Sequence, residues 1–278
     1  MDTLAPILHK ISYMGLPLLF AMVLHEYAHG WAADKCGDPT AKLQGRLTFN
    51  PLAHIDPLGT IILPLLCLAL PGSFLLGWAK PVPVDPRNMR QPRRDMALVA
   101  AAGPGMNLVL AVIGALVVAG LFAFDPTLLA KRPGNADGEP ASLATMILLP
   151  ISVMALYSVM INVFLALFNL IPIPPLDGGR IMTCLLPPAP ALALARLEPY
   201  GMMILMGLIV FDKELRVIHT ITSTFANALS GTILSTNNSG CGIVAKSVIA
   251  RPFGGTVESE LCICARASIR AARTSPAK

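Results

Sequence analysis

The first long apolar segment, residues 11–33, carries polar groups that a membrane helix rarely tolerates. His25, Glu26 and His29 interrupt a run whose length, about 20 residues, is what a helix needs to cross a bilayer. A charged side chain at mid-membrane costs about 2.5–3.5 kcal/mol on insertion scales, so such residues usually have a functional partner. The segment therefore predicts a helix built around a site. The alternative is a helix end whose polar residues face water near the membrane interface.

The composition indicates that the rest of the chain also belongs to a membrane. Of its 278 residues, 54% are hydrophobic and 13% are charged, whereas a soluble domain usually carries about 25% charged residues. We therefore predict an all-α polytopic membrane protein with about five to six membrane segments. Beyond the first, these lie at residues 58–78, 96–124, 143–171, 200–211 and, more weakly, 217–234.

The chain is expected to have one structured domain. No loop between the apolar segments reaches the size of a separate soluble domain, at least about 50 residues, so residues 1–234 form a single membrane domain in this prediction. Residues 235–278 are rich in Ser, Gly, Asn, Thr and Arg, and we expect a disordered tail without a site. The cysteines contain no Cys-x-x-Cys pair, which argues against a disulfide framework or a thiolate zinc site.

The run His25-Glu26-Tyr27-Ala28-His29 has the spacing of a metal site. Residues four apart lie on the same face of a helix, so both imidazoles can reach one cation. Zinc suits two imidazoles and one oxygen ligand, with the fourth position open for water or substrate. Glu26 projects beside this face, where it could deprotonate a water activated by the metal. We predict His25 and His29 as ligands of one Zn²⁺ per chain and Glu26 as the general base.

Asp177 is the best candidate for the missing oxygen ligand. It follows an apolar segment, lies in a Pro- and Gly-rich turn, and is one of few acidic residues near membrane depth. An aspartate before two glycines is also a common structural turn residue, and the His-Glu-x-x-His run is what favours the ligand interpretation. His54 lies in a turn-rich loop and is left out of the metal set, because a lone loop histidine is more often simply solvated.

These motifs together resemble the site-2 protease family of intramembrane zinc metalloproteases, peptidase family M50. The resemblance covers about residues 10–215 and is closest to the small bacterial members without PDZ or CBS domains. It rests on residues 25–29, on Gly103-Pro104-Gly105-Met106-Asn107, and on the run from Asn169 to Gly179.

The resemblance implies zinc bound by His25, His29 and Asp177, with Glu26 as general base. It also places Asn107 near the site, as a candidate oxyanion or substrate contact. The substrates of this family are membrane-spanning helices cut within or near the bilayer. The expected partners are therefore transmembrane protein substrates and the lipid bilayer.

The three proposed ligands restrict the topology. His25 and His29 lie near the C-terminal end of segment 11–33, and Asp177 lies just beyond the C-terminal end of segment 143–171. To share one ion, these two segments must run parallel, which requires that one intervening segment does not cross the membrane. Pro64 and Pro71-Gly72 single out residues 58–78 as a re-entrant element.

This topology has a consequence for charge. Loops 34–57 and 79–95 face the same side and together carry eight basic residues, against two in loop 125–142. By the positive-inside rule, we expect an integral protein of the bacterial inner membrane with its site toward the cytoplasm.

Two other functions fit part of the pattern. A membrane metal transporter could use the same His/Asp cluster as a transit site, although transporters usually show paired repeats or matched broken helices, which are lacking here. A catalytically silent relative that binds substrate helices is a second alternative, although Glu26 is present. The net charge of +5 does not predict nucleic-acid binding, because the basic residues lie in short segments between apolar runs without interleaved aromatic residues.

Overall fold

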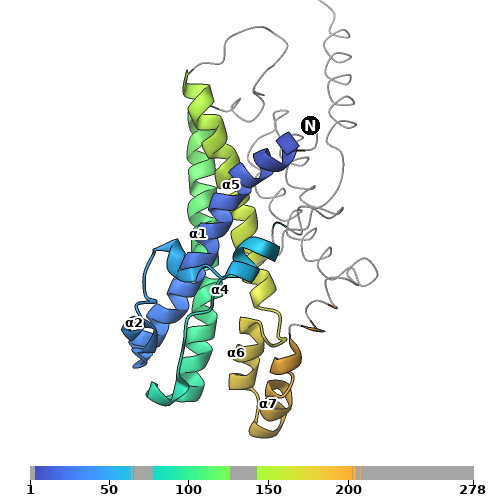
Figure 1. The fold of residues 1–278 in the computed structure, drawn as a ribbon. Helices are drawn as coiled ribbons and strands as arrows, with labels where there is room; N and C mark the ends of the chain where they lie inside the picture. Colours follow the sequence, from blue (N-terminus) through green and yellow to red (C-terminus); the bar gives the residue numbers. More distant parts are fainter. Residues whose placement is uncertain are drawn as a thin grey trace, which may run out of the picture.

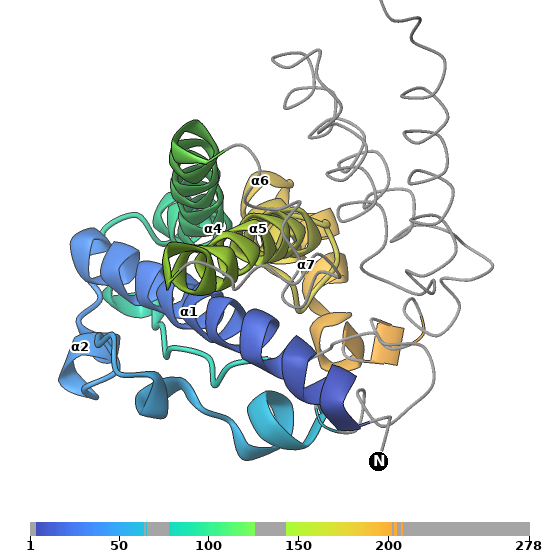
Figure 2. The same ribbon diagram turned by 90° about the horizontal axis from the view of Figure 1, so that it is seen from above.

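Three long helices form the frame of the molecule in a computed structural model of the chain (Figure 1). The structure describes residues 4–63, 65, 78–125, 143–201, 203, 204 and 207, and these residues form helices and loops without a β-strand. The three helices are α1 (Leu4–Cys36), α4 (Pro92–Phe124) and α5 (Leu143–Asn169), each in contact with the other two. α1 lies obliquely across the pair α4 and α5 (Figure 2). The predicted all-α class is confirmed for the described residues.

The directions of these helices agree with the predicted topology. α1 and α5 run the same way, and α4 runs against them (Figure 1). The amide of Arg90 donates a hydrogen bond of 3.3 Å to the carbonyl of Cys36, so the segment between α1 and α4 begins and ends at the same side. The predicted re-entrant element falls largely on residues 64 and 66–77, which lie outside the described residues. The predicted segment 217–234 and the tail 235–278 also lie outside them.

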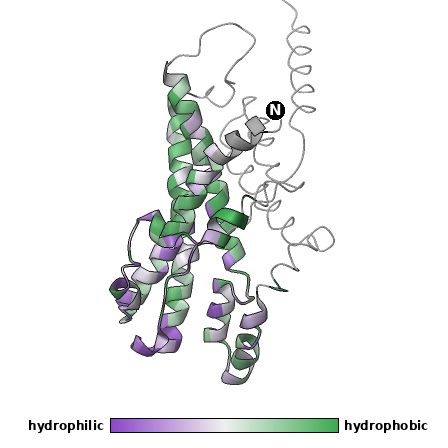
Figure 3. Cartoon of the chain, viewed as in Figure 1, coloured by the Kyte–Doolittle hydropathy of each residue, from purple (hydrophilic) through white to green (hydrophobic). Residues whose placement is uncertain are grey.

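Two helical stretches are apolar and long enough to cross a membrane among the residues that the structure describes. They are Pro92–Leu121 in α4 and Met146–Asn169 in α5. One face of α4 leaves Leu108, Val112 and Leu116 exposed, and Figure 3 shows mostly hydrophobic residues along the upper parts of α4 and α5. Soluble proteins rarely expose apolar residues in this way, so these helices are compatible with the predicted membrane location. The number of segments, five to six, stays a prediction.

Most of the short elements lie at the polar end of the molecule (Figure 3). After α1, Gly37 takes the left-handed conformation (φ 106°), which ends the helix at low cost because glycine has no Cβ. The elements between α1 and α4 are α2 (Thr40–Leu43), η1 (Pro51–His54), the π-helical turn η2 (Pro57–Ile62) and η3 (Pro86–Asn88). After α5 come α6 (Asp177–Leu185), α7 (Pro188–Ala195) and η4 (Glu198–Tyr200).

The fully buried carboxylate of Asp38 joins the end of α1 to the loop that precedes α4. Its oxygens accept hydrogen bonds from the amide of Asp85 (2.7 Å) and from Asn88 Nδ2 (2.9 Å), and Thr40 also donates to it. Burial raises the pKa of Asp38, but the hydrogen bonds outweigh burial and leave that pKa below its ordinary value. An ionised Asp38 therefore fixes residues 85–88 against α1.

Candidate metal centre

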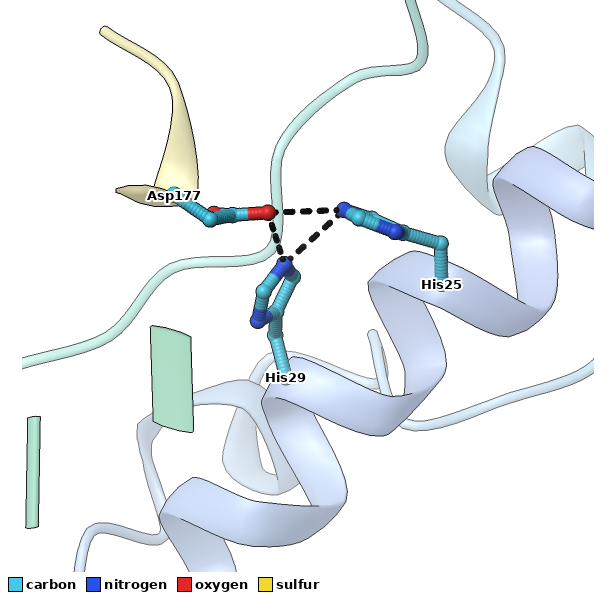
Figure 4. Close-up of side chains that lie close together, drawn as sticks. All are labelled: His25, His29 and Asp177. Carbon is cyan, nitrogen blue, oxygen red and sulfur yellow. Dashed lines mark hydrogen bonds and ion pairs between the residues drawn. The ribbon is translucent and has the colours of Figure 1, made fainter. Parts of the chain in front are cut away.

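His25 and His29 lie one turn apart on α1, and both are 8% exposed. Their Nε2 atoms are 3.0 Å apart. The Oδ2 atom of Asp177, the first residue of α6, lies 3.2 Å from Nε2 of His25 and 3.4 Å from Nε2 of His29 (Figure 4). The structure thus brings together three side chains that the sequence singled out from positions far apart.

The other ring nitrogens show which tautomer the two histidines adopt. Nδ1 of His29 lies 2.7 Å from the carbonyl oxygen of Val99, and Nδ1 of His25 lies 3.3 Å from Oδ1 of Asn107. These oxygens can only accept hydrogen bonds, so each Nδ1 carries the proton and each Nε2 presents a lone pair. Two lone pairs and a carboxylate oxygen then face one another, and Oδ2 of Asp177 is buried without a hydrogen-bond donor. A cation between them would satisfy all three groups.

The donor set fits zinc. A tetrahedral site with zinc–ligand bonds of about 2.0–2.1 Å has ligand atoms about 3.3–3.4 Å apart, and the three observed separations are 3.0, 3.2 and 3.4 Å. Two imidazoles and one carboxylate leave a fourth position open. Within the described part of the chain, His25, His29 and Asp177 are the one group of three His, Cys, Asp or Glu residues arranged to hold a metal ion.

Two glycines after Asp177 allow the turn that brings this carboxylate to α1. A Cβ atom on Gly178 would collide with the carbonyl oxygens of Leu170 and Ile171, and one on Gly179 would collide with the backbone at Pro174. The chain between α5 and α6 therefore packs directly on the first turn of α6. Asp177 can therefore be both a turn residue and a metal ligand, because the tight turn is what positions its carboxylate.

A third glycine lies against the histidine rings themselves. Gly103 is inside α4, and a Cβ atom built on it would be 2.6 Å from Cε1 of His25 and closer still to His29. The absence of a side chain at position 103 lets α4 approach α1 at the depth of the site. Gly105, two residues further on, has no atom within 4 Å of the corresponding Cβ position.

Glu26 lies beside the candidate ligands and is half-buried. Its Oε2 atom accepts a hydrogen bond of 2.8 Å from the amide of Val82. Glu26, the two histidines and Asp177 all line a cavity of about 410 Å³. The apolar side chains in its wall include Met22, Trp78, Met96, Leu165 and Phe168.

The remaining two polar residues that the sequence raised are both buried. Asn107 is completely buried behind His25 and is not among the residues that line the cavity. Its expected contact with an oxyanion or substrate stays a prediction, and its observed contact is with a candidate ligand. His54 is 1% exposed, rather than solvated as a lone loop histidine usually is, and its Nε2 atom lies 2.9 Å from the carbonyl of Thr48.

Sequence reasoning missed three groups at this site. The carbonyl of Val99 and the amide of Val82 are backbone groups, which leave no residue-type signal in the sequence. Arg180 also lines the cavity. Its spacing of three from Asp177 on a helix could have indicated that the two share a face.

Comparison with known proteins gives a consistent result. The family model described as Peptidase family M50 matches residues 13–211. A Bacillus subtilis (strain 168) protein, "Putative zinc metalloprotease YwhC", is 38% identical over 205 residues, which cover 73% of this chain and 82% of that protein. The Mycolicibacterium smegmatis protein "Putative zinc metalloprotease Rip2" is 30% identical over 215 residues, covering 75% of this chain and 71% of the relative. No solved structure gives a significant match.

Proposed function

Because this chain belongs to peptidase family M50, we propose that it is a zinc-dependent endopeptidase of the site-2 protease type that cuts membrane-spanning proteins. In this proposal His25, His29 and Asp177 hold one zinc ion, and Glu26 is the general base. Two relatives carry the description zinc metalloprotease in their names, which supports the choice of metal.

The proposal rests on one observation: three hydrogen-bond acceptor atoms lie close together in a buried place. Nε2 of His25, Nε2 of His29 and Oδ2 of Asp177 lie within 3.4 Å of one another. Without a cation this arrangement would leave a carboxylate oxygen unsatisfied in a buried place, which is costly. Glu26, next to His25 on α1, lines the same cavity.

Each residue has a separate task in the proposed reaction. Zinc, when bound, supplies Lewis acidity that makes water more acidic and polarises the scissile carbonyl. The Glu26 carboxylate takes a proton from the attacking water and passes it to the leaving amine. The Val82 amide holds the Oε2 oxygen of that carboxylate, and the carbonyl of Val99 and Oδ1 of Asn107 hold the two imidazoles in the tautomer that leaves Nε2 free.

The apolar wall of the cavity is an argument for the proposed class of substrate, membrane-spanning proteins. Met22, Leu165 and Phe168 come from α1 and α5 and line the cavity together with the candidate ligands. A substrate helix would have to unwind locally to present a peptide carbonyl there. The proposed partners are thus transmembrane proteins and the lipid bilayer, and the proposed location is the bacterial inner membrane with the site toward the cytoplasm. A transport function for the same cluster finds no support in the family match.

The test uses purified full-length protein in liposomes with a panel of single-span membrane proteins as probes. We expect the wild type to cleave at least one probe, and Glu26→Gln to lower cleavage by about 10²–10⁴-fold while zinc per chain stays unchanged. Removal of zinc with a chelator should abolish cleavage, and added zinc should restore it. Wild-type rates in Glu26→Gln would remove the proposed base. Net zinc movement across the membrane without cleavage of any probe would favour the transporter.

A further inference from the structure

We propose that Arg46 is a positioning residue for the reaction: it holds the backbone of residues 80–82 at the place where the Val82 amide orients the Glu26 carboxylate. This inference rests on the proposed function, because it assumes that Glu26 is the general base. Arg46 has no part in the metal site and belongs to the loop after α2. It would act on the reaction only through the chain segment that it holds.

The contact on which the inference depends is the one between Val82 and Glu26. The amide of Val82 donates a hydrogen bond of 2.8 Å to Oε2 of Glu26. Val82 lies between Pro81 and Pro83, which have no N–H group, so within residues 81–83 it offers the one backbone donor. A residue before proline is also restricted to extended conformations. The local sequence therefore presents one amide toward Glu26 on a stiff piece of backbone.

Arg46 binds this piece of backbone from the other side. Its Nη2 atom donates to the carbonyls of Lys80 (2.8 Å) and Pro81 (3.2 Å), and its Nη1 atom donates to the carbonyl of Ala53. No acidic side chain pairs with Arg46 within the described part of the chain. A guanidinium offers several donors in a fixed planar arrangement. Here these donors join residues 80–81 to the end of η1 at residue 53.

A second connection runs through the residue next to Ala53. The carbonyl of His54 accepts a hydrogen bond of 2.8 Å from the amide of Lys80. The imidazole of His54 is 1% exposed, and its Nε2 donates to the carbonyl of Thr48. Residues 48–54 are thereby folded into a support for the backbone at residue 80. Arg46, two residues before this support, adds a charged group that binds the same backbone.

The expected consequence of losing Arg46 is a misplaced base rather than a lost metal. None of its contacts involves His25, His29 or Asp177, so zinc binding should be unaffected. A misplacement of about 1 Å in a reacting group can lower a rate by about 10²-fold. We expect Arg46→Ala to lower kcat by about 10- to 100-fold, with KM and zinc content within about twofold of the wild type.

The matched control is Arg87→Ala. Arg87 belongs to η3, is exposed like much of the basic loop 79–95, and pairs with Asp85 through a 2.8 Å contact. It donates to no backbone group in residues 78–82. Its removal should leave kcat near the wild-type value. Arg46→Lys keeps the charge but loses the planar set of donors, and it should give a kcat between those of the wild type and Arg46→Ala.

The deciding experiment is a double-mutant cycle with Val82→Pro, which removes the amide that binds Glu26. It uses zinc-loaded full-length protein and a single-span probe that the wild type cleaves. If Arg46 acts through this amide, the double variant should have a kcat within about twofold of Val82→Pro alone, because coupled residues are not additive. A loss equal to the product of the two single losses, or a fall in zinc content in Arg46→Ala, would overturn the proposal.

A readout without turnover accompanies the cycle. Hydrogen exchange at the Val82 amide should be faster in Arg46→Ala than in the wild type and unchanged in Arg87→Ala. Unchanged exchange in Arg46→Ala would contradict the proposal even if Val82→Pro does not fold. Glu26→Gln distinguishes a failure of the proposed base from a failure of the proposed role of Arg46. If it retains cleavage, the assignment of Glu26 as the general base is wrong, and the role of Arg46 falls with it. If it loses cleavage while Arg46→Ala keeps full kcat, the role of Arg46 alone is wrong.

Discussion

Asn107 lies directly behind His25, with its Oδ1 atom 3.3 Å from the Nδ1 atom of a residue 82 positions earlier in the chain. The carbonyl of Val99 takes the same place behind His29, at 2.7 Å. Each candidate ligand therefore has an oxygen acceptor on the side away from the proposed metal. Such partners fix the tautomer and the orientation of a metal-binding histidine and increase its basicity. Only the partner of His25 is a side chain, so it can be removed by mutation.

We predict that Asn107→Ala weakens zinc binding by about 10- to 100-fold, the usual cost of losing such a partner. Competition between the purified protein and a chromogenic chelator measures this change. Asn162→Ala is the matched control, because Asn162 is also buried and its Nδ2 atom donates to Ser158 of its own helix. If Asn107 instead contacts an oxyanion or substrate, kcat should fall while zinc affinity stays at the wild-type level.

Alanine variants of Gly103 and Gly105 differ in whether the added methyl group meets the histidine rings. A methyl group at position 103 would lie within 2.6 Å of an atom of His25, whereas one at position 105 meets no atom within 4 Å. Gly103→Ala should therefore displace the rings and lower both zinc content and cleavage. Gly105→Ala should keep both, and it should be more stable by about 0.5–1 kcal/mol because alanine favours a helix interior. Equal zinc content in the two variants would show that the close approach of α4 is not required.

The sequence could predict the side-chain part of this site but not its backbone part. His25, Glu26 and His29 were predictable because their spacing on a helix is fixed by 3.6 residues per turn. Asp177 could be found because the chain has few acidic residues at membrane depth. Its proposed ligand role requires α1 and α5 to be parallel, as they are in the structure. The amide of Val82 and the carbonyl of Val99 could not be predicted, since every residue has such groups and only tertiary packing selects one.

A substitution of Asp177 can show whether this residue is a metal ligand or only a structural turn residue. We predict that Asp177→Asn lowers zinc per chain by at least about tenfold after dialysis against a chelator, because a lost ligand costs more than a lost partner of a ligand. Asp85→Asn is the control, since Asp85 caps the short helical turn η3 but lies outside the site. Metal analysis and thermal unfolding are measured on the same samples. A drop in stability without a loss of zinc would assign Asp177 to the turn alone.

The side of the membrane that the site faces can be tested through the basic loops. The hydrogen bond between Arg90 and Cys36 places the start of α4 beside the end of α1, so both ends should face the same compartment. In a cysteine-free variant that still binds zinc, we predict that Arg90→Cys resists an impermeant maleimide in intact bacteria and reacts in inverted vesicles, because positively charged loops stay in the cytoplasm. Lys131→Cys, in the loop predicted for the other side, should show the opposite pattern. Labelling of Arg90→Cys in intact cells would place the metal centre toward the outer side and overturn the proposed orientation without affecting the assignment of its ligands.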